Sequence, residues 1–202
     1  MCRLTGFTDT RSGQSYNKSA TLDAMRDCLA HGGPDDAGRL LDAPLALGHR
    51  RLSVLDLSPQ GRQPMRRGPR SLAWNGELYN FRELRRELEG LGYFFSTQTD
   101  TEVALQAFAA WGPEAVQRFR GMFAFALWNH DARRLLLARD RLGIKPLYWY
   151  RKEGLFMFAS ELKAFHRHPD FDKGLDSGAV SLFLQQGYIH APHCIYHHAH
   201  KL

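Results

Sequence analysis

Met1-Cys2-Arg3-Leu4-Thr5-Gly6-Phe7 opens the chain, and we expect the rest of the fold to be organised around it. When the initiator methionine is removed, Cys2 becomes the N-terminal residue and carries both a thiol and a free α-amine. An α-amine titrates near ~8 in model peptides, so part of it is neutral at neutral pH and can accept a proton. A thiol with a base on the same residue needs no separate histidine to become a nucleophile. Taken alone, however, a cysteine at position 2 is more simply explained as chance.

Length and composition narrow the class of protein. The chain has 202 residues, 44% of them hydrophobic, which suits one compact domain with a sizeable core. No stretch approaches the ~20 apolar residues of a membrane span, and Asp9 and Arg11 come too early for a signal peptide. Three cysteines at unrelated spacings, Cys2, Cys28 and Cys194, indicate neither a disulfide framework nor a zinc site. We therefore expect a cytoplasmic protein with no membrane partner.

The basic charge does not indicate nucleic-acid binding. The net charge is +6, but arginine and lysine alternate with aspartate and glutamate along the chain. The one dense basic stretch, residues 62–70, is interrupted by two prolines and a glycine and is typical of an exposed loop. We expect no nucleic-acid partner.

Apolar periodicity and turn residues predict strands and helices in alternating groups. Strands are predicted over residues 4–7, 45–47, 52–57, 72–74, 122–128, 135–139, 147–150 and 155–159. Helices are predicted over residues 22–30, 80–91, 99–111, 113–118 and 177–186, with an irregular end over the last 13 residues. Asn80 with Glu83, and Thr99 with Glu102, have the spacing of capping boxes. This order of elements indicates a layered α/β or α+β domain, and periodicity distinguishes no further.

Eight motifs follow one another along almost the whole chain and together point to one family. They are Met1-Cys2 with Gly6-Phe7, His31-Gly32-Gly33-Pro34-Asp35, Gly48 to Val54, Trp74 to Asn80, Thr99 to Glu102, Gly121 to Ala126, Ala138 to Tyr148 and Ala159 to Lys163. In this order they closely resemble the glutaminase domain of glutamine-hydrolysing asparagine synthetases, which are class II glutamine amidotransferases and N-terminal-nucleophile hydrolases. The resemblance implies an α+β fold of four αββα layers, with helices flanking two stacked antiparallel sheets.

The resemblance also implies an activity, the hydrolysis of L-glutamine to glutamate and ammonia through a thioester on Cys2. It assigns Cys2 as nucleophile and base, and the Asn75 side chain with the Gly76 N–H as the oxyanion hole. Arg51 matches the residue that binds the glutamine α-carboxylate, and Asp100 the one that binds the α-ammonium. The implied substrate-binding set is Arg51, Leu52, Val54, Asn75, Gly76, Glu77 and Asp100, with no metal.

Simpler interpretations exist for several of these residues. Asn75-Gly76 is also a common hairpin turn, and Arg51 could be a surface arginine, as its neighbour Arg50 is expected to be. Asp100 could be a carboxylate favoured at a helix start by the helix dipole. Arg139, Asp140 and Lys145 are interpreted as a structural network of charges in the interior or at a turn.

Two departures from the family's pattern lie near the predicted nucleophile. Arg3 stands where the family has a glycine, and Gly32 stands where the family's His-Arg-Gly-Pro-Asp loop has its arginine. On a strand, the residue after Cys2 points to the opposite face from the thiol, so we expect Arg3 to lie behind the catalytic strand. There it would need a partner or a vacated space, and we expect it to occupy part of the space beside Gly32.

The domain organisation follows from the same resemblance. Residues 1–187 are predicted to be the glutaminase domain and residues 188–202 the start of a linker towards a synthetase domain that this sequence lacks. ATP and Mg²⁺ would belong to that domain, so no cofactor is expected here. The expected partners are L-glutamine, a separate synthetase domain or acceptor subunit, and a second copy in a homodimer. The rival interpretation is a truncated or decayed non-catalytic domain that binds glutamine or a partner without turnover, and Arg3 and Gly32 favour it.

Overall fold

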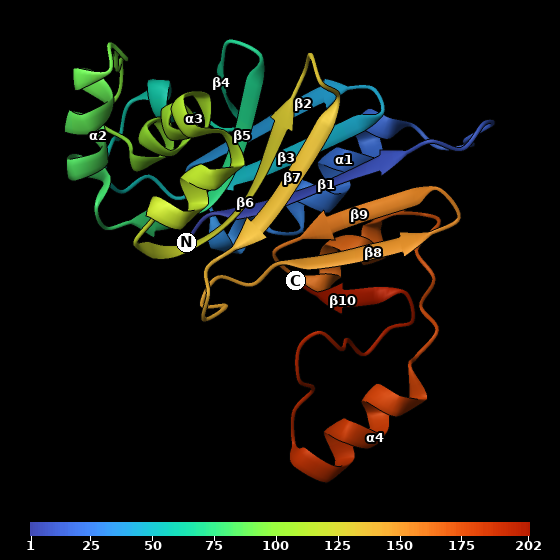
Figure 1. Ribbon diagram of the computed structural model, residues 1–202. Helices are drawn as coiled ribbons and strands as arrows, with labels where there is room; N and C mark the ends of the chain where they lie inside the picture. The colour runs from blue at the N-terminus through green and yellow to red at the C-terminus, as the bar shows by residue number, and fades with distance from the viewer.

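The computed structural model describes residues 1–202. It contains two antiparallel sheets that are stacked face to face and flanked by helices (Figure 1). The strands are β1 Arg3–Asp9, β2 Asp36–Asp42, β3 Leu45–Arg51, β4 Met65–Arg67, β5 Arg70–Leu78, β6 Gly121–Asn129, β7 Arg134–Arg139, β8 Tyr148–Lys152, β9 Leu155–Ala159 and β10 Ala199–Lys201. The α-helices are α1 Lys18–Asp27, α2 Phe81–Gly90, α3 Asp100–Trp111 and α4 Ser177–Gln186. Short 3₁₀ helices cover Ala30–Gly32, Pro59–Gly61, Gly112–Arg118 and Leu162–Arg167. One sheet has the order β10-β8-β9-β1-β3-β2, and the other has the order β4-β5-β6-β7.

The alternation of side chains along the strands divides the core into three apolar layers. On β1, Leu4 packs between the two sheets, whereas Phe7 points the other way into a cluster with Leu22 of α1. On β5, Trp74 belongs to the cluster beneath α2 and α3 that includes Phe108. The result is an α–β–β–α sandwich, which confirms the predicted α+β four-layer fold.

Strand β1 lies in the middle of its sheet, between β9 and β3, which fixes where the N-terminus ends up. Gly6 is needed for this position, because a Cβ there would lie 2.4 Å from Phe158 Cζ and 2.6 Å from the Ala46 carbonyl oxygen. The N-terminal end of β1 lies at the edge of the inter-sheet layer, close to the ends of β3 and β5.

Some predicted strands were wrong at positions that matter for the site. Residues 52–57 were predicted as a strand, but β3 ends at Arg51 and these residues form a loop. The strand predicted to stop at Asn75 instead runs through it to Leu78, because Asn75 and Gly76 pair with Ala124 and Phe123 of β6. The hairpin-turn interpretation of Asn75-Gly76 is therefore wrong.

Smaller differences also have local causes. Strands β2, β4 and β10 were not predicted, and β10 forms within the supposedly irregular end because Ala199–Lys201 pairs with β8. Asn80 does not cap α2, since its side chain instead binds the Arg118 carbonyl oxygen and the Arg120 N–H. Thr99 does cap α3, accepting the Glu102 N–H, but the Glu102 carboxylate accepts from the Ser96 and Thr97 N–H groups and does not complete the predicted capping box.

The last helix, α4, extends away from the sandwich and buries only one of its side chains, Ala179 (Figure 1). The predicted boundary between residues 187 and 188 stays a prediction. None of the helices is long and apolar enough to cross a membrane.

Candidate active site at the start of β1

The Cys2 thiol lies at the rim of the inter-sheet layer, on the same face of the chain as Leu4. Its Sγ accepts the Leu52 N–H at 3.3 Å and lies 3.6 Å from the Leu52 carbonyl oxygen. Burial raises the pKa of the Cys2 thiol, while the Leu52 N–H and the N-terminal ammonium partly oppose this. The resting sulfur is thus a protonated thiol, and it requires a base before it can act as a nucleophile.

Asn75 faces the same layer, because positions 73, 75 and 77 of β5 point between the sheets. Its side chain is fully buried, and neither Oδ1 nor Nδ2 has a hydrogen-bond partner. Buried amides are nearly always paired, and leaving one unpaired costs about 1–3 kcal/mol. An amide held unpaired beside a thiol is available for a ligand.

Position 76 requires a glycine, because the neighbouring strand leaves no space for a side chain. A Cβ there would lie 2.3 Å from the Met122 carbonyl oxygen of β6. Asn75 and Gly76 line a small cavity together with Cys2. The geometry therefore brings the predicted nucleophile and both predicted oxyanion residues to one place.

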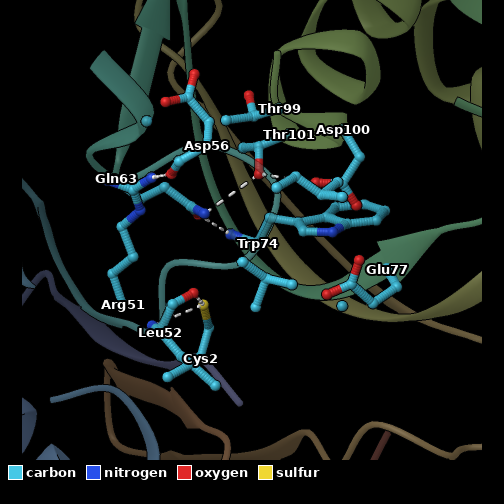
Figure 2. A pocket seen from close by; sticks show the side chains of 14 residues that line it. Cys2, Arg51, Leu52, Asp56, Gln63, Trp74, Glu77, Thr99, Asp100 and Thr101 are labelled. Atoms are coloured by element: carbon cyan, nitrogen blue, oxygen red, sulfur yellow. Dashed lines mark hydrogen bonds between the residues drawn. The ribbon is translucent and has the colours of Figure 1, made fainter. Parts of the chain in front are cut away.

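A second, larger cavity also contains Cys2 in its lining (Figure 2). It is lined by Cys2, Arg51, Leu52, Val54, Leu55, Asp56, Gly61, Gln63, Trp74, Gly76, Glu77, Thr99, Asp100 and Thr101. The predicted substrate-binding residues all line this cavity except Asn75, which lines only the smaller one. Its lining therefore combines the Cys2 thiol with charged side chains of both signs.

Arg51 is buried at one end of this cavity and is not the surface arginine of the simpler interpretation. Its guanidinium donates to the Ser58 carbonyl oxygen at 2.9 Å and to that of Asp56, which holds the 52–58 loop in place. Gly61 packs against the guanidinium, where a Cβ would lie 2.2 Å from Nη2. The guanidinium retains further N–H donors that a carboxylate in the cavity could accept.

Two carboxylates, Asp100 and Glu77, lie at the other end of the cavity. Asp100 Oδ2 accepts the Leu78 N–H at 2.8 Å, which fixes the carboxylate at the first turn of α3. Burial, with a smaller contribution from the charge of Glu77, raises the pKa of Asp100 to about 6. Burial also raises the pKa of Glu77, opposed by Lys145. A cationic group placed between these carboxylates would relieve their repulsion.

Sequence reasoning missed several residues that build the cavity, of which Gln63 is the most connected. Its Oε1 accepts the Trp74 N–H at 2.6 Å and its Nε2 donates to Thr101 Oγ1 at 3.2 Å. Gln63 therefore ties β5 to the start of α3 across the cavity. It lies in the basic stretch that was interpreted as an exposed loop, and no motif marks it.

Arg3 points to the face opposite the thiol and lies directly on Gly32, as predicted. A Cβ on Gly32 would lie 2.6 Å from Arg3 Cγ. The guanidinium donates to Glu161 at 2.5 Å and to the Cys2 carbonyl oxygen at 3.0 Å. Arg3 thus has the partner that a cation in this position requires.

The other charged groups are arranged as follows. Asp140 accepts the backbone N–H groups of Phe123, Ile144 and Lys145, which confirms the structural role predicted for Asp140. Arg50 is only partly exposed, and its Nε donates to the Gly33 carbonyl oxygen at 3.0 Å. No three His, Cys, Asp or Glu side chains come together in a way that could hold a metal ion, and a metal-free reaction stays a prediction.

Comparison with solved structures identifies the fold class. The chain superimposes on the glutamine phosphoribosylpyrophosphate amidotransferase of B. subtilis with a TM-score of 0.70 at 21% identity, covering 82% of this chain and 43% of that one. The four-layer sandwich with a cysteine at the start of β1 is the N-terminal-nucleophile hydrolase fold.

Sequence comparison then identifies the family. A family model described as glutamine amidotransferase domain matches residues 1–202, so the chain belongs to the glutamine amidotransferase domain family. It is 38% identical over 185 residues to asparagine synthetase [glutamine-hydrolyzing] 3 of Bacillus subtilis, covering 90% of this chain and 30% of that protein. It is 34% identical over 224 residues to the putative asparagine synthetase [glutamine-hydrolyzing] 2 of Methanocaldococcus jannaschii, covering 100% of this chain and 42% of that protein. The chain therefore spans about a third of the length of these relatives.

Proposed function

We propose that the chain hydrolyses L-glutamine to glutamate and ammonia, with Cys2 as the N-terminal nucleophile. The observation that carries this proposal is the buried, unpaired side-chain amide of Asn75 in the same cavity as the Cys2 thiol. Buried amides are nearly always paired, so an unpaired donor and acceptor next to a cysteine favour a ligand-binding role.

The substrate would bind with its α-carboxylate at Arg51 and its α-ammonium at Asp100 and Glu77, so that its side-chain amide points towards Cys2. An anion at Arg51 and a cation at the two carboxylates match the charges at the two ends of the cavity. Leu52 and Val54 also line the cavity and would contact the aliphatic part of the substrate.

The reaction would proceed in two steps. The neutral α-amine of Cys2 takes the thiol proton while Sγ forms a bond to the amide carbon, and the resulting oxyanion accepts from the Asn75 Nδ2–H and the Gly76 N–H. The C–N bond then breaks, and the α-ammonium returns its proton to the leaving nitrogen, which departs as ammonia. Water next attacks the thioester with the α-amine again as base, releasing glutamate and the thiol. Each oxyanion donor is worth about 3 kcal/mol of barrier on the scale of known deletions.

The ammonia acceptor is a second part of the proposal. The asparagine-synthetase relatives are much longer than this chain, so we propose that ammonia passes to a synthetase domain or separate acceptor subunit. ATP and Mg²⁺ would act there, and no residue of this chain is assigned to them. A cytoplasmic location and a homodimer stay predictions.

A glutaminase assay tests the proposal directly. Protein that begins at Cys2, verified by intact mass, should release glutamate and ammonia in equal amounts, and Cys2→Ala should release neither. Cys28→Ala and Cys194→Ala are matched controls and should retain activity. Turnover by Cys2→Ala within a few-fold of the wild type would refute the nucleophile, and no turnover by the wild type would favour the non-catalytic alternative.

A further inference from the structure

Lys145 has a buried ammonium group, and the proposed reaction gives it no role. Its residue is only 1% exposed, and its side chain lines the small cavity of Cys2, Asn75, Gly76 and Glu77. Its backbone N–H donates to Asp140 at 3.0 Å, so the Asp140 turn holds the residue in place. Its Nζ has a single polar contact, the Met1 thioether Sδ. A thioether is a weak acceptor and leaves the buried charge largely uncompensated.

The charged groups around this ammonium come from several elements. Glu77 on β5 and Asp140 after β7 favour its charged form, whereas burial and Arg3 on β1 lower the pKa of Lys145. Asp140 is already bound by three backbone N–H groups, and Arg3 is bound to Glu161. Arg51 and Asp100, at the two ends of the substrate cavity, act on Cys2 through their charges. A stabilising ion pair therefore does not explain Lys145, since Glu77 makes no close contact with it.

We propose that Lys145 is a positioning residue for the Cys2 reaction, and that its ammonium keeps unprotonated the N-terminal α-amine of Cys2, which lines the same small cavity. This inference rests on the proposed function. Two cationic groups that share a small cavity disfavour each other's charged forms. An α-amine titrates near ~8 and a lysine near ~10.4, so the proton lost from the pair leaves the α-amine first. The pair then holds one proton on Lys145 and a neutral base on Cys2.

Glu77 strengthens this argument. Its carboxylate lines the same cavity, and without Lys145 it would favour a protonated α-amine. Lys145 compensates the negative charge of Glu77 and also repels a protonated α-amine. Removing Lys145 therefore favours the protonated α-amine in both ways. Removal of Met1 frees the α-amine of Cys2 and, in the same event, removes the thioether from the ammonium.

Lys145→Met tests the proposal, because methionine retains much of the length of the side chain and removes the charge. In protein that begins at Cys2, the pH at which kcat/KM reaches half its maximum should rise by about one unit, so the rate on the acidic side falls about tenfold. The rate at the alkaline plateau should stay within about threefold of the wild type. Lys145→Arg keeps the charge and should retain the wild-type profile. Lys152→Met, which removes a half-exposed lysine paired with Asp172, is the control.

A decrease in kcat/KM of equal size at every pH, or an unshifted pH profile of kcat/KM, would overturn the proposal. Lys145 would then have a structural role. Urea unfolding establishes whether each variant is folded. If Lys145→Met does not fold, Lys145→Gln is measured in its place.

A second measurement does not depend on glutamine turnover. The rate at which the Cys2 α-amine is acetylated, followed by mass spectrometry across pH, should fall about tenfold near neutrality in Lys145→Met. An unchanged acetylation profile overturns the inference even if the chain hydrolyses glutamine. A shifted profile in a chain without turnover upholds the inference while the proposed function fails.

Discussion

The exchange of residues at positions 3 and 32 makes a quantitative prediction. Arg3 covers Gly32 so closely that even Gly32→Ala would place a Cβ 2.9 Å from the Arg3 Nε and Cζ. Gly32→Arg would add a second guanidinium beside the first. Overpacking of this kind costs about 1–3 kcal/mol, and here like charges add to it.

The opposite single change, Arg3→Gly, removes the guanidinium from Glu161 and from the Cys2 carbonyl oxygen. Although burial acts to raise it, hydrogen bonds from Arg3, Lys163 and His31 lower the pKa of Glu161 to about 2. Such a shift corresponds to about 3 kcal/mol shared among three partners and reduced by solvent, so the part of Arg3 is about 1 kcal/mol. Glycine within a strand costs about 0.5–1 kcal/mol more.

The double variant Arg3→Gly with Gly32→Arg should recover most of both losses, because the new guanidinium enters the space that Arg3 vacates. We expect a coupling of about 2–3 kcal/mol in the free energy of unfolding, measured by urea titration of the wild type, both singles and the double. The glutaminase rate of the double should equal or exceed that of the wild type, and each single should be slower. Effects that add within about 0.5 kcal/mol would show that the two positions are independent and would refute the exchange.

Three further changes separate substrate binding from chemistry. Asn75→Ala should lower kcat roughly a hundredfold with KM little changed, since it removes an oxyanion donor; a change confined to KM would contradict this role. Arg51→Lys keeps the charge but loses the planar pair of donors, so glutamine binding measured by calorimetry in a Cys2→Ala background should weaken; unaltered binding would remove Arg51 from the carboxylate site. Glutamine binding should also weaken as the pH falls through about 6, because the raised pKa of Asp100 means that its carboxyl is charged above that pH and neutral below it. Asp100→Asn should bind weakly at every pH, and a retained pH dependence in this variant would assign the titration to another group.

Sequence patterns predicted α3 well because its boundaries have chemical markers, whereas α1 runs over Lys18–Asp27 and not over the predicted residues 22–30. Thr99 caps α3 and Gly112 follows its last residue, and both were read from residue type alone. The strands at the site were harder, since Asn75 and Gly76 are turn formers in isolation. Their extended conformation is imposed by pairing with β6, a partner distant in the sequence.

The site residues were predicted only through the family motifs. Nothing local in Arg51 or Asp100 distinguishes a substrate-binding group from a surface charge or a helix-start carboxylate. Gln63 and Lys145 were not assigned to the site because their position depends on how the two sheets meet. The unpaired state of the Asn75 amide, the strongest single observation, is likewise a property of packing.

The measurement that tests the central claim most directly is the trapping of the thioester on Cys2. Protein that begins at Cys2 is mixed with glutamine, quenched in acid within one turnover and analysed by intact and peptide mass. The N-terminal peptide should gain the mass of one glutamyl group, and no such increase should occur in Cys2→Ala or in protein that still carries Met1. A glutamyl adduct on Cys28 or Cys194, or release of glutamate in single-turnover experiments without any adduct on Cys2, would contradict the central claim.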